Sequence, residues 1–253
     1  MATVDLVIPV YNEEHVLAGS VDTLLRYLQH HPEHEWRVVV ANNASTDGTL
    51  EVARQLEEQT GGKVLALDIG TKGRGIALRV AWLTSPADVV AYMDVDLSTD
   101  IAHIPELVDP LTNDEADVAY GTRLDKRSQT KRSFKREFIS RSYVFILRTL
   151  AGLKVSDAQC GFKAMRRDAA RAIVPLVKDT QWFFDSELLL IAQKNGYRLH
   201  EIPVRWDEDP DTRVHIVKTA TEDLRGIWRL RSKGVPRVSR PPADPPRTFL
   251  DAT

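Results

Sequence analysis

The carboxylates of Asp94 and Asp96 are the side chains whose type and spacing point most directly to chemistry. They stand one residue apart, directly after the apolar run "DVVAYM" that ends at Met93. In an extended chain alternate side chains point the same way, so both carboxylates could reach one ion. Proteins hold Mg²⁺ or Mn²⁺ with one or two carboxylates and with phosphate oxygens of a substrate. The alternative is a solvated turn that caps a helix, because "DLSTDIAHIPEL" predicts a helix near residue 100.

The elements that must position this pair are short apolar runs alternating with amphipathic segments. The predicted strands are residues 4–10, 36–41, 63–69, 88–94 and 116–122 and the stretch "RLHEIPVRW". The predicted helices are residues 13–30, 49–59, 168–174 and 218–233 and the stretch "GRGIALRVAWLTS". The order of the first four strands predicts an α/β fold with a mostly parallel, twisted sheet flanked by helices on both faces. Open sheets of this kind bind ligands at the carboxyl ends of their strands, where the acidic pair would lie.

Three further loops are expected at that same edge. "PVYNEE" follows the first strand and brings a tyrosine ring and acceptors suited to a nucleoside, although these are also ordinary helix-start residues. "NNASTDGT" follows the second strand, and a tight turn that caps a helix explains it equally well. "GTKGRG" carries Lys72 and Arg74 at a helix start, where backbone N–H groups and cations could approach a diphosphate. Its spacing matches neither the dinucleotide fingerprint nor the phosphate-binding P-loop.

Composition limits the class of protein. The 253 residues, 43% of them hydrophobic, predict one domain over residues 1–234, followed by a proline-rich, disordered tail at 235–253. A net charge of −2 excludes a global attraction to nucleic acid, and the single cysteine, expected to be packed, suits a reducing compartment. The N-terminus has no signal-peptide pattern, and the apolar stretch around Arg148 is too short to span a bilayer. We therefore expect a cytoplasmic protein, at most peripheral on the cytoplasmic face of the membrane.

Together, several motifs resemble one enzyme family, although no single motif is specific. They are "IPVYNEE", "NNASTDGT", "TKGRGIALRVA", "YMDVDLST", "YGTR", "KREFISR", "DAQCGFKAMRRDAA" and "WFFDSELLLIAQKNGYRLHEIPVRW". Over residues 4–207 the chain resembles glycosyltransferase family 2, which has the GT-A fold, and within it the polyprenyl-phosphate glucosyl- and mannosyltransferases, nearest the dolichyl-phosphate beta-glucosyltransferase branch. This resemblance implies metal-dependent, inverting transfer of glucose, or else mannose, from UDP-glucose or GDP-mannose to a polyprenyl phosphate, with Mg²⁺ or Mn²⁺ as cofactor.

The resemblance also implies roles for residues on the donor side. The expected nucleotide-sugar contacts are Pro9, Tyr11, Glu13, Asn42, Lys72, Asp94, Val95 and Asp96, and the expected metal ligands are Asp94, Asp96 and Ser98. Two positions depart from the family pattern. Ser98 stands where the family often has a metal-supporting glutamine, so water would complete the metal shell. Asn42 replaces an aspartate that reads the base, and its amide oxygen could accept the same hydrogen bond without charge assistance.

On the acceptor side the resemblance places the lipid-phosphate site at Arg123, Arg136 and Ser140, and gives Asp157 and Arg123 positions near the reacting centre. Asp157 would orient a group or remove a residual proton, unless it only caps the turn into "CGF". Residues 126–148 combine cations with aromatic and aliphatic side chains, which suits contact with an anionic membrane surface. Leu224, Ile227 and Trp228 could add to that contact, whereas a solvated helix face is the ordinary fate of such a charge run.

Other functions remain open at the level of the sequence. A soluble acceptor, such as a sugar or a small phosphorylated metabolite, would suit the same donor site. A non-catalytic nucleotide-sugar-binding protein would have no need of both carboxylates of the acidic pair. A nucleotidyltransferase also combines a metal with an α/β sheet, but "PVYNEE" and "DAQCGFK" are not its signatures. For Asp185 and Glu187, which precede a helix with a buried pattern, we favour a structural role.

Overall fold

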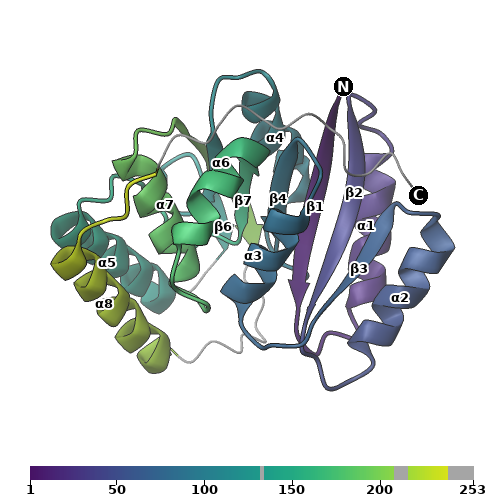
Figure 1. The fold of residues 1–253 in the computed structure, drawn as a ribbon, viewed down its shortest axis with the longest axis horizontal. Coiled ribbons are helices and arrows are strands. Elements are labelled where there is room, and N and C mark those ends of the chain that lie inside the picture. The colour runs from purple at the N-terminus through teal and green to yellow at the C-terminus, as the bar shows by residue number, and fades with distance from the viewer. Residues whose placement is uncertain (132–133, 208–215, 239–253) are drawn as a thin grey trace.

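The computed structural model describes residues 1–131, 134–207 and 216–238, which form an α/β fold around a seven-stranded sheet (Figure 1). Its elements are β1 (Ala2–Val10), α1 (Leu17–Leu28), β2 (His34–Asn43), α2 (Thr49–Thr60), β3 (Val64–Ile69), α3 (Arg74–Thr84), β4 (Val89–Met93), a 3-10 turn (Ile101–His103), α4 (Ile104–Thr112), β5 (Val118–Thr122), β6 (Gln129–Lys131), α5 (Phe134–Ala151), β7 (Phe162–Arg166), α6 (Arg167–Ile173), a 3-10 turn (Val174–Leu176), α7 (Phe184–Lys194), β8 (Leu199–Pro203), β9 (Arg205–Asp207) and α8 (Ile216–Lys233).

The order of strands in the sheet is β3-β2-β1-β4-β7-β5-β8, and all neighbours are parallel except those of β7. β7 runs antiparallel to both β4 and β5 and comes from the "GFKAM" part of a segment to which we had assigned no element. The prediction of a mostly parallel sheet is confirmed. The expected single strand "RLHEIPVRW" is instead two strands in different sheets, because β9 leaves β8 and pairs with β6.

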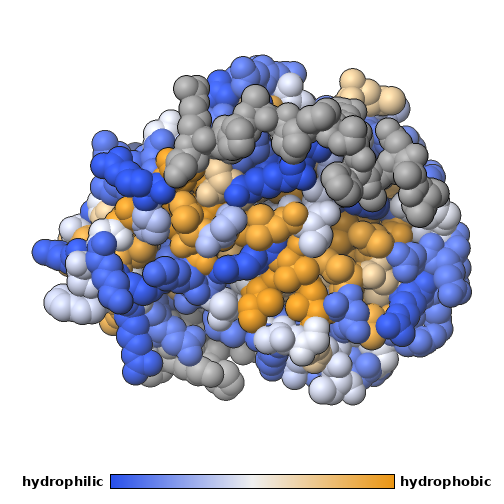
Figure 2. All heavy atoms as spheres, in the orientation of Figure 1, coloured by the Kyte–Doolittle hydropathy of each residue, from blue (hydrophilic) through white to orange (hydrophobic). Residues whose placement is uncertain are grey.

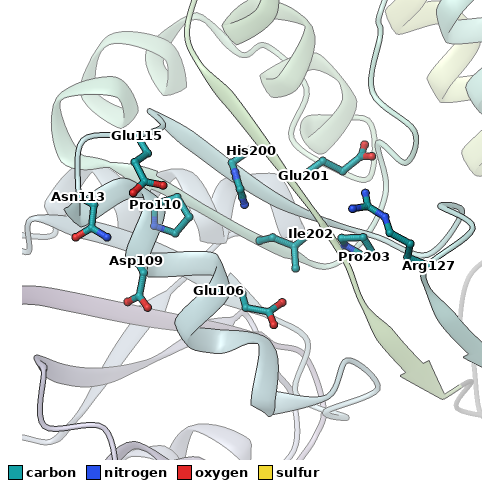
Figure 3. A pocket seen from close by; sticks show the side chains of 10 residues that line it. All are labelled: Glu106, Asp109, Pro110, Asn113, Glu115, Arg127, His200, Glu201, Ile202 and Pro203. Carbon is teal, nitrogen blue, oxygen red and sulfur yellow. The ribbon is translucent and has the colours of Figure 1, made fainter.

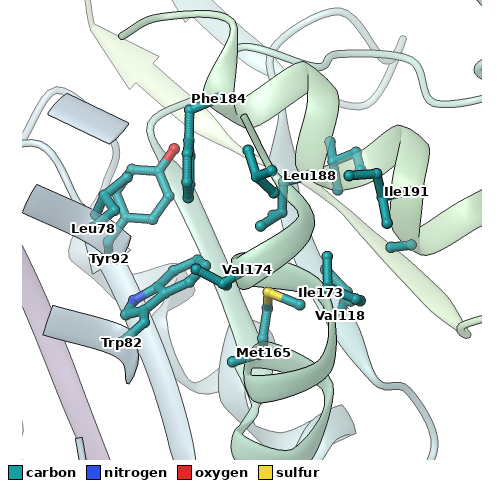
Figure 4. Close-up of a cluster of buried hydrophobic side chains, with 14 of the residues drawn as sticks. Leu78, Trp82, Tyr92, Val118, Met165, Ile173, Val174, Phe184, Leu188 and Ile191 are labelled. Atoms are coloured by element: carbon teal, nitrogen blue, oxygen red, sulfur yellow. The ribbon is translucent and has the colours of Figure 1, made fainter. Parts of the chain in front are cut away.

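Each face of the sheet is apolar because alternate residues of a strand point to opposite sides. In β4, Val90 and Tyr92 join a core with α3, α6 and α7, and Val89 and Ala91 join a second core with α1 and α4. Figure 4 shows the first core, where the ring of Trp82 lies 5.8 Å from that of Tyr92. Helices on both faces, as predicted, therefore hold the strand ends in fixed positions.

The face toward the viewer carries hydrophobic side chains at its surface. Figure 2 shows them gathered over α3 and the neighbouring strands. Leu65 and Leu67 of β3 and Ile76 of α3 are partly buried and pack against the core of this face. The edge strand β3 is therefore apolar on this face as far as Leu67, and the exposed Asp68 follows near its carboxyl end.

The predicted boundary between domain and tail lies too early. The side-chain amide of Asn195 donates to the Pro236 carbonyl (2.9 Å) and its oxygen accepts from the Val238 amide (2.8 Å). Val235 and Val238 also pack against the core, so residues 235–238 belong to the folded body. The rest of the predicted tail, 239–253, lies outside the described residues. In the described part of the chain, no helix has both the length and the apolar character to cross a bilayer.

Candidate functional site

The acidic pair lies in a turn just beyond β4. The strand ends at Met93, and the Leu97 amide then donates to the Asp94 carbonyl (3.3 Å), with Leu97 in a left-handed conformation (φ 52°). The strand that we predicted over residues 88–94 therefore ends one residue earlier, and the chain is not extended between the two aspartates, because the ladder with β1 and β7 ends before them. The turn still leaves Asp96 exposed and the side chain of Asp94 37% exposed at the carboxyl end of the central strand.

Arg74, the first residue of α3, neutralises Asp94. Its guanidinium Nη2 lies 2.8 Å from Asp94 Oδ1, and the group is placed over the rings of Tyr92 (5.4 Å) and Trp182 (4.8 Å). Burial raises the pKa of Asp94, the Arg74 charge opposes that shift, and the neighbouring Asp96 carboxylate adds to it. Arg74 was absent from our predicted site residues, although the glycine-rich loop that carries it was recognised.

Gly161 makes room for Asp94 on the other side. A Cβ atom at Gly161 would lie 1.9 Å from Asp94 Oδ2, far inside contact distance. The glycine stands immediately before β7, the antiparallel neighbour of β4, so the sheet brings it against the turn. The carboxylate is therefore confined between a cation and a backbone surface.

The oxygens of the acidic pair fit a divalent cation. Asp96 Oδ1 accepts from the Ser98 amide (2.9 Å), whereas Oδ2 of Asp94 and Oδ2 of Asp96 accept no hydrogen bond from the described residues. No cluster of three or more His, Cys, Asp or Glu side chains suited to a metal occurs in that part of the chain. A cation here would therefore need oxygens of substrate and water as well, which is how Mg²⁺ is commonly held.

Ser98 and Val95 have contacts that narrow their roles. The Ser98 carbonyl accepts from the Asp207 amide (2.9 Å), which ties the turn to β9. The Val95 side chain is 8% exposed and belongs to the hydrophobic core, so only its backbone is available to a ribose. Whether the Ser98 hydroxyl supports a metal stays a prediction.

The loop after β1 is joined to the loop after β2. Asn12 has a left-handed backbone (φ 56°); its amide donates to Ser45 Oγ (3.0 Å), and its side-chain oxygen accepts from the Thr46 amide (2.8 Å). Beside it, the Lys72 ammonium lies 3.5 Å from the centroid of the Tyr11 ring. The structure thus brings Tyr11 and Lys72, predicted from separate loops, to one place.

Pro9 and Glu13 occupy the start and the end of this connection. Pro9 lies inside β1 and pairs with Ala41, and the strand ends at Val10 as predicted. The Glu13 amide donates to Thr49 Oγ1 (2.8 Å) at the start of α2. The residues after Asn12 therefore form a turn, and α1 begins at Leu17 rather than at residue 13.

Asn42 is buried and already bound. Its side-chain oxygen accepts from the Ser45 amide (3.3 Å), its NH₂ group donates to Asp68 Oδ1 (2.9 Å), and the residue is only 2% exposed. This does not support our expectation that its amide oxygen accepts a hydrogen bond from the base. The exposed group is instead the carboxylate of Asp68 on β3, which sequence reasoning missed.

Arg123 and Asp157 form a buried ion pair after β5. Arg123 Nε and Nη2 donate to the two oxygens of Asp157 (2.7 and 3.1 Å), and the main-chain amides of Arg123 and Gln159 donate to them as well. Burial raises the pKa of Asp157, but the guanidinium outweighs this and holds the pKa below its ordinary value. A carboxylate so engaged and only 2% exposed is suited to orienting Arg123 rather than to removing a proton.

The rest of the predicted acceptor site lies on α5. Ser140 is partly buried there, whereas the side chain of Arg136 lies outside the described residues. Arg123 itself lies below the ring of Trp206 on β9 (5.5 Å). The structure thus places Arg123 at the strand edge and Ser140 on the adjoining helix, and whether they hold one phosphate stays a prediction.

A buried ionic network lies under the acidic pair. The Lys163 ammonium lies 3.1 Å from Asp185 Oδ1, and the Tyr92 hydroxyl donates to the same carboxylate. Glu187 is fully buried and accepts from both terminal nitrogens of Arg229 on α8 (2.7 and 2.8 Å). These contacts support the structural roles that we favoured for Asp185 and Glu187.

Cys160 is packed as expected. It is fully buried, and burial raises the pKa of its thiol to about 12. A thiol with that pKa is not a nucleophile at neutral pH.

One open hollow lies elsewhere on the molecule. It has a volume of about 370 Å³ and lies between α4 and β8, where Glu106, Glu115, His200 and Glu201 line it (Figure 3). None of the predicted site residues lines this hollow. The hollow therefore plays no part in the arrangement at the strand ends.

The fold is that of GT-A type glycosyltransferases. Among solved structures the chain is similar to glucosyl-3-phosphoglycerate synthase from Mycobacterium tuberculosis, with a TM-score of 0.65 and 16% identity over 93% of this chain and 80% of that one. It is also similar to mannosyl-3-phosphoglycerate synthase from Rubrobacter xylanophilus, with a TM-score of 0.67 and 16% identity over 98% and 80% of the two chains. At these identities the likeness concerns the fold alone.

The sequence comparisons identify the family. The pattern described as "Glycosyl transferase family 2" matches residues 5–174, and the chain belongs to this family, as its motifs predicted. It is 35% identical to glycosyltransferase AglD of Haloferax volcanii over 94% of the chain, which spans only 38% of that relative. It is 30% identical to dolichyl-phosphate beta-glucosyltransferase ALG5C of Trichomonas vaginalis (92% of this chain, 75% of the relative) and 30% identical to the dolichyl-phosphate beta-glucosyltransferase of Mus musculus (89% and 77%).

Proposed function

We propose that this chain transfers a hexose, glucose in preference to mannose, from a nucleotide sugar to a polyprenyl phosphate, with inversion at the anomeric carbon. Relatives that the chain covers over most of their length carry the name dolichyl-phosphate beta-glucosyltransferase. The observation that carries the proposal is the pairing of an exposed acidic turn, suited to a donor diphosphate, with an oriented arginine at the same sheet edge. The two are linked by residues 157–161, because Asp157 binds Arg123 and Gly161 lies against Asp94.

The donor would be held at the ends of β1 to β4. Tyr11 offers a ring to the base, and Lys72 and Arg74 offer cations to the diphosphate at the start of α3. Mg²⁺ or Mn²⁺, bound by Asp94 and Asp96, would offset charge on the departing nucleoside diphosphate. Arg74 would then share the neutralisation of Asp94 with the cation rather than compete for the same oxygen, since only Oδ1 is paired with it.

The acceptor phosphate would bind at Arg123. One of its oxygens attacks the anomeric carbon from the side opposite the nucleoside diphosphate, and the bond from that carbon to the diphosphate oxygen breaks. A phosphate monoester is already ionised at neutral pH, so no strong base is needed. That agrees with the engagement of both Asp157 oxygens by Arg123. The guanidinium would bring two anionic substrates together, which repulsion would otherwise resist.

The lipid part of the acceptor suggests where the protein meets a membrane. The helices α5 and α8 lie side by side (Figure 1). They expose Phe138 (74%), Phe145 (66%), Leu224 (49%) and Trp228 (71%), with arginines at Arg141, Arg148, Arg225 and Arg231. Ile227, which we had included in this surface, is instead buried in the core. Aromatic side chains beside cations suit the interface of an anionic leaflet, so we propose peripheral contact there, on the cytoplasmic face.

Transfer assays on the purified 253-residue chain test this function. UDP-glucose, GDP-mannose and UDP-GlcNAc are each supplied with Mg²⁺ or Mn²⁺ and a short polyprenyl phosphate in detergent, and products are identified by mass spectrometry. We expect that the chain forms a hexosyl polyprenyl phosphate only when the metal is present, and that the Asp94→Asn variant forms none. If no donor is consumed and Asp94→Asn binds nucleotide sugar like the unaltered chain, the proposal is wrong.

A second assay separates lipid from soluble acceptors. Charge reversal at Arg148, which is exposed on α5 and distant in sequence from Arg123, should weaken binding to vesicles of anionic lipid and slow transfer to a long-chain acceptor. Transfer to a water-soluble phosphate ester should be unaffected by that variant. If the Arg148 variant and the unaltered protein transfer to the long-chain acceptor at equal rates, a soluble acceptor is favoured instead.

A further inference from the structure

Asp68 is an exposed carboxylate at the end of β3 that the proposed chemistry does not use. The parallel register pairs Val10 of β1 with Asn42 of β2, and Asn42 with Asp68 of β3. These residues therefore form one row across the carboxyl edge of the sheet, and Tyr11 directly follows that row. A base that stacks on Tyr11 would lie beside the polar end of the row.

The buried amide of Asn42 holds Asp68 in one orientation. Its oxygen accepts from the Ser45 amide, so its NH₂ group must face Asp68, to whose Oδ1 it donates at 2.9 Å. The other oxygen, Asp68 Oδ2, accepts no hydrogen bond from the described residues. One acceptor oxygen is thus fixed in position and directed away from Asn42.

We propose that Asp68 Oδ2 accepts a hydrogen bond from the ring N–H of the donor's base, and that this base is uracil. The inference rests on the proposed function, since it requires a nucleotide in this site. Uracil carries a hydrogen on N3, whereas cytosine presents a lone pair at N3, which a carboxylate oxygen repels. Adenine has no ring N–H at all.

Guanine is the closer competitor. It presents N1–H and N2–H side by side, a pattern that is best satisfied by both oxygens of one carboxylate. Asn42 already engages Oδ1, so a single oxygen is left for the base. Uracil offers a single N–H between two carbonyl groups, which matches one acceptor.

Nucleotide binding by the 253-residue chain tests the proposal without any acceptor. Dissociation constants for UDP, CDP, GDP and ADP are measured by calorimetry in Mn²⁺ for the unaltered chain and for Asp68→Asn. In this variant the new oxygen must turn toward the Asn42 NH₂ group, so an NH₂ donor faces the base. A hydrogen bond to a charged group contributes about 1.5 to 3 kcal/mol, so UDP should bind at least about tenfold more weakly. CDP, which has an acceptor at N3, should bind more tightly than before.

Asp22→Asn is the matched control, because Asp22 is an exposed aspartate on α1 paired with Arg26. It should change none of the four constants. The inference is overturned if Asp68→Asn leaves the ratio of UDP to CDP affinity within about twofold, or if the unaltered chain prefers GDP to UDP. Failure of the proposed function looks different: either no nucleotide binds, or UDP binds in the expected way while no hexose reaches polyprenyl phosphate.

Discussion

Replacing Gly161 by alanine should disable the acidic turn while leaving the fold intact. The new Cβ would lie 1.9 Å from Asp94 Oδ2 and 2.6 Å from its Cγ, whereas ordinary contacts begin at 3.4 Å. The backbone at Gly161 has no positive φ, so alanine brings no conformational strain of its own. The carboxylate is the mobile partner in this clash and would have to retreat by about 1.5 Å to reach ordinary contact.

The size of the effect follows from that displacement. Misplacing a catalytic group by about 1 Å can cost about 100-fold in rate, which corresponds to about 2.7 kcal/mol of transition-state stabilisation. The retreat would also disturb the 2.8 Å contact of Asp94 with Arg74. Overpacking in a well-packed region costs about 1 to 3 kcal/mol of stability, which an α/β domain of this size tolerates.

Donor consumption in Mn²⁺, Mn²⁺ affinity and thermal unfolding should be measured together for Gly161→Ala. We expect kcat/KM to fall about 100-fold and Mn²⁺ to bind more weakly, with a cooperative unfolding transition. Gly19→Ala is the control, because a Cβ at Gly19 in α1 would meet nothing within 4 Å and should slightly stabilise the helix. A folded Gly161→Ala chain with activity within about threefold of the unaltered chain would refute the assignment of Asp94 to the reaction.

Three further changes test the surrounding structure. Asp157→Asn leaves the Arg123 guanidinium without its buried partner. Because folding lowers the pKa of Asp157, the variant should lose about 3 kcal/mol of folding stability at pH 7, and this loss should fade below about pH 4. Denaturant titrations that show an equal loss at pH 7 and below about pH 4 would contradict this. Burial raises the pKa of Asp223 to about 7, so the folding stability of the unaltered chain should fall as pH rises from about 4 to 7. Asp223→Asn should gain stability at pH 8, on the order of 4 kcal/mol at most, and none at pH 4. A gain in stability that is independent of pH would argue against a buried charge. Phe145→Ser with Trp228→Ser should weaken vesicle binding more than tenfold in a sedimentation assay and leave UDP affinity unchanged, and retention of full vesicle binding would exclude the α5–α8 surface.

Much of the donor edge could be predicted because its signals are local. Apolar runs end where turn residues begin, and a parallel sheet brings such ends together. The approach of Lys72 to Tyr11 follows from that rule although the two are far apart in the chain. The turn between Asp94 and Asp96 could not be predicted in this way, because the rule does not say at which residue the ladder stops.

Contacts between elements were less accessible to sequence reasoning. β7 has only five residues and lies antiparallel between β4 and β5, an arrangement that depends on partners distant in the chain. The roles of Arg74 and Gly161 at Asp94, and of Asn42 at Asp68, depend on that pairing and on the register of β2 with β3. A family comparison marks Asn42 as a departure, but only the register shows that a carboxylate stands beside it.

The segment at residues 157–161 connects the two halves of the proposed reaction. Its first residue, Asp157, binds Arg123, which we propose for the acceptor, and its last, Gly161, leaves room for Asp94, which we propose for the donor. Between them, the Gln159 side chain donates to Asp223 (3.0 Å) on α8, one of the two helices that expose aromatic side chains. Because β7 follows directly and is paired on both sides, this segment has little freedom to move without disturbing the sheet. The central strands therefore set the distance between Arg123 and Asp94, whereas α8, the helix that would meet a lipid surface, contacts this segment through the side-chain amide of Gln159.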